Sequence, residues 1–277
     1  MGPLDVPTFG LFMIIAFAVA YLALAGDLKR RQIKIDPYNV VLYVAIAGII
    51  GAKIWHVFDT PEDRLHWQIL GHPRELLNWF RGGFAWFGGF VAGIGTLLVL
   101  GHRYKINLLR MLDIASPAAA IGYAVGRIGC LVSGDGDYGK PTNWAWPWGM
   151  AFPNGQMPTT QTCPQAIDAA HPNGWPADCN VYPTPIYEFV AGVAIFWYIW
   201  RRGRAGQTLP PGVLTGEFLM LSGAERFLIE FIRINPRVIL GMSNAQFTAL
   251  LSMIAGAVLM LWASRGSARP VVAAEQP

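Results

Sequence analysis

The chain has 277 residues, of which 53% are hydrophobic and 14% charged, and it carries a formal net charge of +4. Soluble domains are about 25% charged, and this chain holds several apolar runs long enough to span the hydrocarbon core of a bilayer. The composition argues against a soluble globular protein and predicts an all-α polytopic membrane protein. The net positive charge reflects the placement of loop residues and does not indicate a nucleic-acid partner.

Seven apolar segments predict seven transmembrane helices. In chain order they cover residues 9–26, 38–58, 83–101, 112–133, 185–200, 213–232 and 245–263. No basic residue precedes the first segment, so we expect it to remain as a helix and not to be cleaved as a signal peptide. Residues 1–263 then form one transmembrane domain, and residues 264–277 form a short tail.

Basic residues predict the orientation of these helices. Twelve of them fall in loops on one side of the membrane: Lys29, Arg30, Arg31, Lys34, Arg103, Lys105, Arg110, Arg201, Arg202, Arg204, Arg265 and Arg269. The other side holds Arg64, Arg74, Arg81, Lys140 and Arg237. Because cytoplasmic loops carry the excess of Lys and Arg, we expect the N-terminus outside and the C-terminus and its tail in the cytoplasm.

The longest outer loop, residues 135–183, is inserted between the fourth and fifth helices and is rich in Pro, Trp, Asn and Gly. Its length and aromatic content predict a small folded cap at the level of the lipid headgroups. Cys163 and Cys179 both lie in this loop, where an oxidising compartment would favour a disulfide, although spacing alone does not decide the pairing. Cys130 lies in the fourth apolar segment, and we interpret it as a free buried thiol.

Several short motifs do not predict a site. The stretch GDGDYG at 134–139 matches a dinucleotide-binding fingerprint, but it follows a membrane helix and not a strand. Asp135 and Asp137 could suggest calcium, yet the other ligands of a calcium loop are missing. The chain contains no CxxC, HExxH or GxSxG motif. We therefore expect neither a metal nor a cofactor.

Charged residues inside the apolar segments are more informative. Arg127 lies deep in the fourth segment, where an unpaired charge costs roughly 2.5 kcal/mol or more. Arg226, Glu230 and Arg233 have the i, i+4, i+7 spacing that would place them on one face of the sixth helix. One interpretation is a ladder of neutralising charges that only allows insertion. The other counts Lys53 as a further cation, finds more cations than acids, and predicts an anionic ligand such as a lipid phosphate, which arginine can bind through two donors.

Four motifs occur in the order typical of bacterial prolipoprotein diacylglyceryl transferases, and the chain resembles that family from about the first helix to the last. The motifs are RGGFAWFGG at 81–89, GRIG at 126–129 with YG at 138–139, YPTPIYE at 182–188, and ERFLIEFIR at 225–233. The resemblance implies transfer of diacylglyceryl from phosphatidylglycerol to the lipobox cysteine of a preprolipoprotein in the bacterial cytoplasmic (inner) membrane. A thioether would form and glycerol phosphate would be released.

The resemblance also implies roles for individual residues. Arg127 would contact the phosphate, Arg226 would be the second essential cation, and Glu230 with Arg233 would hold Arg226 in place. Tyr187 and Glu188 would form a neighbouring wall. Gly88, Gly89, Asp135 and His56 complete the predicted substrate-binding set.

Three departures from the family pattern bear on the chemistry. Phe87 replaces a histidine often proposed to accept the thiol proton, Cys130 replaces an asparagine, and Phe9 replaces a tyrosine. His56, Glu188 and Asp135 are the alternative proton acceptors that the sequence offers, beside direct loss of the proton to water. A relative that binds or moves anionic lipid without catalysis is a second hypothesis. An ion-coupled transporter is a weaker third, because no inverted repeat is recognisable.

Overall fold

The computed structural model describes residues 8–59, 85–205 and 209–267. Residues 81–84 of the first family motif and residues 268–277 of the predicted tail lie outside this part of the chain. The chain divides into two compact units, one within Met1–Ala23 and Ser116–Pro277, the other within Leu24–Ala115. Each unit is described by itself.

Seven long helices occupy the positions of the seven predicted segments in the described part of the chain. They are α1 (Thr8–Arg30), α2 (Pro37–Asp59), α4 (Trp86–Arg103), α5 (Leu108–Ser133), α7 (Thr184–Arg202), α8 (Val213–Ile229) and α9 (Asn244–Ser267). Local signals mark the start of two of these helices. The Asn107 side chain accepts a hydrogen bond from the backbone N–H of Leu109 at the start of α5, and Pro185 occupies the first turn of α7.

Within residues 8–59, 85–205 and 209–267, four helical spans are long and apolar enough to cross a membrane: Thr8–Arg30, Pro37–His56, Leu108–Ser133 and Asn244–Arg265. Helix α4 contains a shorter apolar stretch, Phe87–Arg103. Helices α7, with 19 residues, and α8, with 17, are not among the four. The described chain is helical and consistent with a multi-pass membrane protein.

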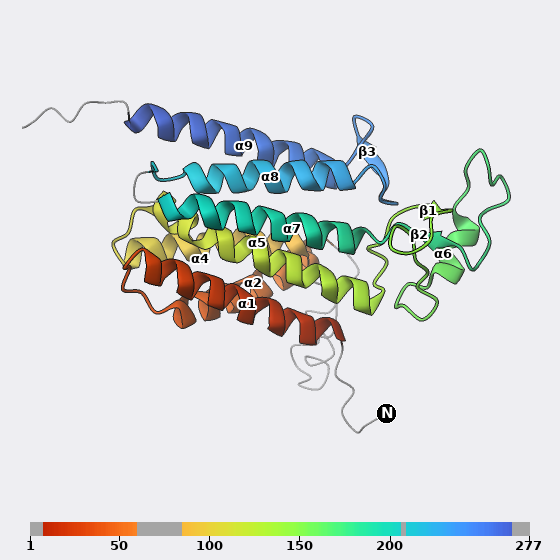
Figure 1. Ribbon diagram of the computed structural model, residues 1–277, viewed down its shortest axis with the longest axis horizontal. Coiled ribbons are helices and arrows are strands. Elements are labelled where there is room, and N and C mark those ends of the chain that lie inside the picture. The colour runs from red at the N-terminus through yellow and green to blue at the C-terminus, as the bar shows by residue number, and fades with distance from the viewer. Residues whose placement is uncertain (1–7, 60–84, 206–208, 268–277) are drawn as a thin grey trace, which may run out of the picture. The chain divides into compact units, whose positions relative to one another are not determined.

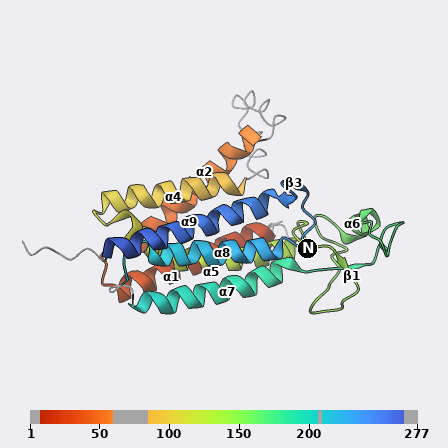
Figure 2. The ribbon, with the colours of Figure 1, turned by 90° about the horizontal axis from the view of Figure 1, so that it is seen from above.

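In the unit within Leu24–Ala115, α2 packs closely against α4 (Figure 2). A Cβ atom at Gly88 would lie 2.1 Å from the Gly51 carbonyl oxygen, and one at Gly51 would lie 2.5 Å from the Gly88 oxygen. A Cβ at Gly89 would lie 3.2 Å from the Gly48 oxygen. Gly88 and Gly89 therefore allow two helix backbones to approach each other, as small residues do in membrane helices.

In the other unit, α8 and α9 lie side by side (Figure 1). Gly216 and Gly256 face each other, since a Cβ on either would lie 2.8 or 2.6 Å from the other's carbonyl oxygen. A Cβ at Gly192 of α7 would lie 2.9 Å from the Ala124 Cβ of α5. On α5, a Cβ at Gly122 would lie 3.4 Å from the Ala20 Cβ of α1, whereas a Cβ at Gly126 would meet nothing within 4 Å.

Residues 135–183 form the folded cap that the sequence predicts, beyond the ends of α5 and α7 (Figure 1). Strand β1 (Pro141–Thr142) pairs antiparallel with β2 (Asn180–Val181), and α6 (Thr159–Gln165) lies between them in sequence. Cys163 and Cys179 form a disulfide. The buried cap core consists of Tyr138, Phe152, Cys163, Cys179 and Val181.

A short hairpin that the sequence analysis did not predict joins α8 to α9. Its strands are β3 (Arg237–Ile239) and β4 (Met242–Ser243). Helix α8 ends at Ile229, three residues earlier than predicted, so the predicted helical face holding Arg226, Glu230 and Arg233 is wrong for Arg233. Arg233 instead forms an isolated β-bridge with Gly139 of the cap.

Candidate active site

A glycine turn at the end of α5 begins the site. Gly134 and Gly136 have φ angles of +58° and +89°, a backbone region that favours glycine. A Cβ at Gly134 would also lie 2.6 Å from the Gly155 Cα atom. The turn directs the chain back so that Asp137 reaches Arg127, ten residues earlier on the helix.

Arg127 uses both terminal nitrogens of its guanidinium group. Nη1 donates to Asp137 Oδ2 at 2.5 Å, and Nη2 donates to Glu188 Oε2. Nη1 also lies 3.4 Å from the Cys130 sulfur atom. The buried arginine thereby links the cap turn to α7.

Glu188 is the central carboxylate of the cluster, and its side chain is completely buried. Its Oε1 accepts hydrogen bonds from Arg226 Nη1 at 2.7 Å and from the Tyr123 hydroxyl at 3.1 Å. Its Oε2 binds Arg127 and lies 3.6 Å from Arg233 Nη1. Glu188 therefore lies within ion-pair distance of three arginines.

Glu230, directly after α8, is held in place from several directions. Its Oε2 lies 3.2 Å from Arg226 Nη2, and its Oε1 accepts hydrogen bonds from Asn235 and Ser243 at 2.7 and 2.8 Å. Ser243 also exchanges hydrogen bonds with Gln246 in a capping box that begins α9. The hairpin thus positions Glu230, and Glu230 positions Arg226.

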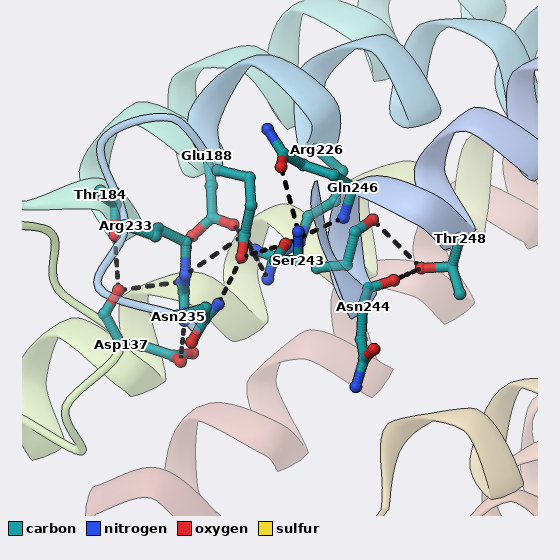
Figure 3. A network of polar contacts seen from close by, with 12 residues as sticks. Asp137, Thr184, Glu188, Arg226, Arg233, Asn235, Ser243, Asn244, Gln246 and Thr248 are labelled. Atoms are coloured by element: carbon teal, nitrogen blue, oxygen red, sulfur yellow. Dashed lines mark hydrogen bonds and ion pairs between the residues drawn. The ribbon is translucent and has the colours of Figure 1, made fainter. Parts of the chain in front are cut away.

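Arg233 connects the end of α8 to the cap. Its Nη2 lies 2.5 Å from Asp137 Oδ1, and its Nη1 donates to the Asp137 carbonyl at 2.9 Å. The neighbouring backbone N–H of Lys140 donates to the Ile232 carbonyl at 2.7 Å. Thr184, at the start of α7, donates its hydroxyl to the same Asp137 carbonyl. Three segments distant in sequence therefore meet at Asp137 (Figure 3).

The charges of this network balance, because Arg127, Arg226 and Arg233 each pair with two or more of Asp137, Glu188 and Glu230. The predicted excess of cations over acids is therefore not found here. The sequence analysis missed Asp137 as a partner. Burial alone would raise the pKa of Asp137, but the guanidinium groups of Arg127 and Arg233 outweigh it and hold that pKa below its ordinary value.

The three arginines differ in exposure. The Arg226 side chain is 28% exposed, compared with 11% for Arg127 and 6% for Arg233. The buried Nε–H groups of Arg127 and Arg233 have no hydrogen-bond acceptor among the described residues. Unsatisfied buried donors are costly, so these two groups favour an acceptor that is not part of the described chain.

Tyr187 and Asp135 occupy the edge of this site and not its centre. Tyr187 donates its hydroxyl to the Trp148 carbonyl at 2.6 Å, so this side chain faces the cap although it neighbours Glu188 in sequence. Asp135 accepts the backbone N–H of Asp137 in the glycine turn. Burial and the neighbouring Asp137 carboxylate raise the pKa of Asp135.

The other predicted site residues, Gly88, Gly89 and His56, belong to the unit within Leu24–Ala115, as does Lys53. Gly88 and Gly89 make the α2–α4 contact, and His56 lies in the last turn of α2. Cys130 is free and buried, as expected. It lies near Asp135 and Asp137, but guanidinium groups occupy both Asp137 oxygens, so the trio gives no support for a metal ion.

Several residues of the network were not predicted as site residues, among them Tyr123, Asp137, Thr184, Asn235 and Ser243. Asp137 directly precedes the YG of 138–139, and Thr184 lies inside the YPTPIYE motif, so these motifs were the available signal. Asn235 and Ser243 lie in the hairpin region, and only its folding brings them to Glu230.

The fold and the site together define a class: a helical membrane protein whose helix ends hold a buried cluster of arginines and carboxylates under a disulfide-linked cap. The chain belongs to the prolipoprotein diacylglyceryl transferase family, whose sequence pattern matches residues 1–262.

Three similar proteins are named phosphatidylglycerol–prolipoprotein diacylglyceryl transferase. The protein from Leptospira interrogans is 33% identical over 83% of this chain and 72% of its own length. Those from Nitrosomonas europaea and Cupriavidus necator are each 30% identical over all of this chain, and over 92% and 94% of their own lengths.

Proposed function

We propose that this protein transfers the diacylglyceryl group of phosphatidylglycerol to the thiol of a lipobox cysteine in a preprolipoprotein. The names of its relatives support phosphatidylglycerol and a prolipoprotein as the two substrates. The products are a thioether-linked lipoprotein precursor and glycerol phosphate, and no cofactor is required. The reaction takes place in the bacterial cytoplasmic (inner) membrane. The topology that we propose has seven spans with the N-terminus outside, and in it the arginine cluster lies near the outer leaflet.

The observation that carries this proposal is the arginine cluster itself. Arg226 is the most exposed of the three arginines and is held by two carboxylates, Glu188 and Glu230. A planar guanidinium held in this way can present two donors to a phosphate. The unsatisfied Nε–H groups of Arg127 and Arg233 support an anionic ligand at the same place.

The chemistry needs a stabilised leaving group. The cysteine sulfur attacks the glyceryl carbon that is bonded to a phosphate oxygen, a carbon–sulfur bond forms, and the carbon–oxygen bond breaks. Negative charge then accumulates on the departing phosphate. Donors that are already oriented stabilise such charge without reorganising during the reaction. We assign this role to Arg226, with Arg127 and Arg233 providing further positive charge behind it.

The test uses purified protein in phosphatidylglycerol vesicles with a synthetic lipobox peptide. Mass spectrometry should show a diacylglyceryl adduct on the peptide cysteine. Arg226→Gln should reduce the initial rate by about 100-fold or more, a typical cost of removing one donor that stabilises transition-state charge. The matched control is Arg202→Gln, which removes another α7–α8 ion pair, that of Arg202 with Glu217, and should retain the rate per folded protein.

Two outcomes would count against the proposal. No adduct from the unaltered protein, with phosphatidylglycerol still retained in native mass spectra, would favour a lipid-binding protein without transferase activity. Equal losses of rate and abundance in the Arg226 and Arg202 variants would show that Arg226 has only a structural role.

A further inference from the structure

Glu225 on α8 differs from the other carboxylates of the cluster in its ion pairing. Its Oε1, like Oε2 of Glu230, is buried and has no hydrogen-bond donor among the described residues. No ion pair joins it to a described arginine or lysine, although Arg226 follows it in sequence. Asp137, Glu188 and Glu230 are each paired with at least two arginines.

Glu225 nevertheless belongs electrostatically to the site. Its charge interacts with Tyr123 and Arg127 of α5 and with Glu188 of α7. It also interacts with Arg226 of its own helix and with Arg233 beyond the end of that helix. Glu225 is thus a carboxylate within the arginine cluster that does not hold an arginine in place.

This difference determines which carboxylate can accept a proton at low cost. Protonating Asp137, Glu188 or Glu230 would weaken ion pairs that fix the arginines, and a broken buried ion pair costs several kcal/mol. Protonating Glu225 removes no ion pair with a described residue.

We propose that Glu225 is the catalytic proton acceptor for the substrate thiol. The inference rests on the proposed transferase function. The thiol proton moves to the Glu225 carboxylate as the sulfur forms its bond to the glyceryl carbon and the bond from that carbon to the phosphate oxygen breaks. The proton then passes to the departing phosphate or to water, which restores the carboxylate. Phe87, which cannot accept a proton, leaves this role to another residue.

The experiment measures adduct formation by Glu225→Gln between pH 6 and pH 10, with peptide and phosphatidylglycerol as above. At neutral pH we expect a loss in kcat of about 100-fold or more, the usual contribution of a general base. The KM for phosphatidylglycerol should stay unchanged, because Glu225 does not bind the phosphate. The fall in rate of the unaltered protein toward acidic pH should be absent from the pH–rate profile of Glu225→Gln. The difference from the unaltered protein should shrink as the pH rises past roughly 8.5, where the thiol ionises unaided.

The matched control is Glu217→Gln, which removes a buried carboxylate of the same helix whose partner is Arg202. We expect it to retain the pH profile of the unaltered protein. Glu225→Asp should recover part of the rate, since it restores a carboxylate at that position. Both comparisons separate proton transfer from a general need for negative charge on α8.

Three results would overturn the assignment. The first is a rate of Glu225→Gln at neutral pH within threefold of that of the unaltered protein. The second is a loss of rate in Glu225→Gln that is the same at every pH. The third is that Asp135→Asn, and not Glu225→Gln, abolishes the fall in rate at acidic pH. Failure of the unaltered protein to form any adduct is a separate result. It would contradict the transferase function, and not the choice of Glu225 over the other acids.

Discussion

Arg127 lies between carboxylates that the chain supplies from opposite directions, Asp137 from the cap turn and Glu188 from α7. A charge that would be costly inside an apolar helix is thereby neutralised, and the same pairing fixes the direction of its guanidinium plane. The three arginines are therefore paired with carboxylates, and binding of an anion by the more exposed Arg226 is our proposal. The unsatisfied Nε–H groups favour a ligand in addition to the pairing.

At the scale of single residues, we predict that Asp137→Asn destabilises the protein in a pH-dependent way. The pKa of Asp137 is held below its ordinary value of 3.8 by Arg127 and Arg233, against the opposing effect of burial. A depressed pKa means that the stabilisation is complete above pH 3.8 and is lost as the pH falls below it.

Thermal unfolding in detergent should measure this effect. The unaltered protein should melt several degrees above Asp137→Asn, by a constant margin between pH 5 and pH 8, and the margin should shrink below about pH 4. Asp178→Asn, a change in an exposed cap residue, is the control for handling at low pH. A margin that grows on acidification would contradict the pairing.

At the scale of helices and strands, contacts between helices position the site. Helices α8 and α9 approach through glycines, and the capping box at the start of α9 presents Ser243 to Glu230. Any separation of these two helices would therefore move Glu230 and, with it, Arg226. In the other unit, α2 and α4 also approach each other at glycines, Gly51 and Gly88.

We predict that Gly256→Val lowers stability by about 1–3 kcal/mol, the usual cost of overpacking a close contact. Already the Cβ atom would lie 2.6 Å from the Gly216 carbonyl oxygen, so the helix backbones must separate. Chemical unfolding in mixed micelles would measure the loss. Gly95→Ala is the control, because its Cβ would meet no heavy atom within 4 Å. Equal stability of the two variants would show that α8 and α9 tolerate separation.

At the scale of the whole molecule, the arrangement is a set of helices with a folded, disulfide-linked cap between α5 and α7. The cap is tied to the site by the Gly139–Arg233 bridge and by the pairing of Asp137 with two arginines. Folding of the cap and assembly of the site are therefore coupled. The position of the membrane around these helices remains our proposal, with the cap outside and the loop after α7 in the cytoplasm.

Single introduced cysteines test this orientation. The native cysteines do not interfere, because Cys130 is buried and Cys163 is bonded to Cys179. A membrane-impermeant thiol reagent should label Asp168→Cys in intact cells and should label Arg204→Cys only after the membrane is opened, since both positions are exposed. Labelling of Arg204→Cys in intact cells would reverse the proposed topology.

The sequence by itself determined the helices, because a long apolar run has few alternatives to a membrane helix. It also determined the folded cap and the motifs that hold Arg127, Glu188, Arg226 and Glu230. Only the tertiary structure decided how these charges pair, since Asp137, Asn235 and Ser243 reach the arginines through turns and a hairpin without a periodic pattern. It likewise decided that α8 ends before Arg233, because the backbone of the cap pairs with that segment and competes with a further helical turn.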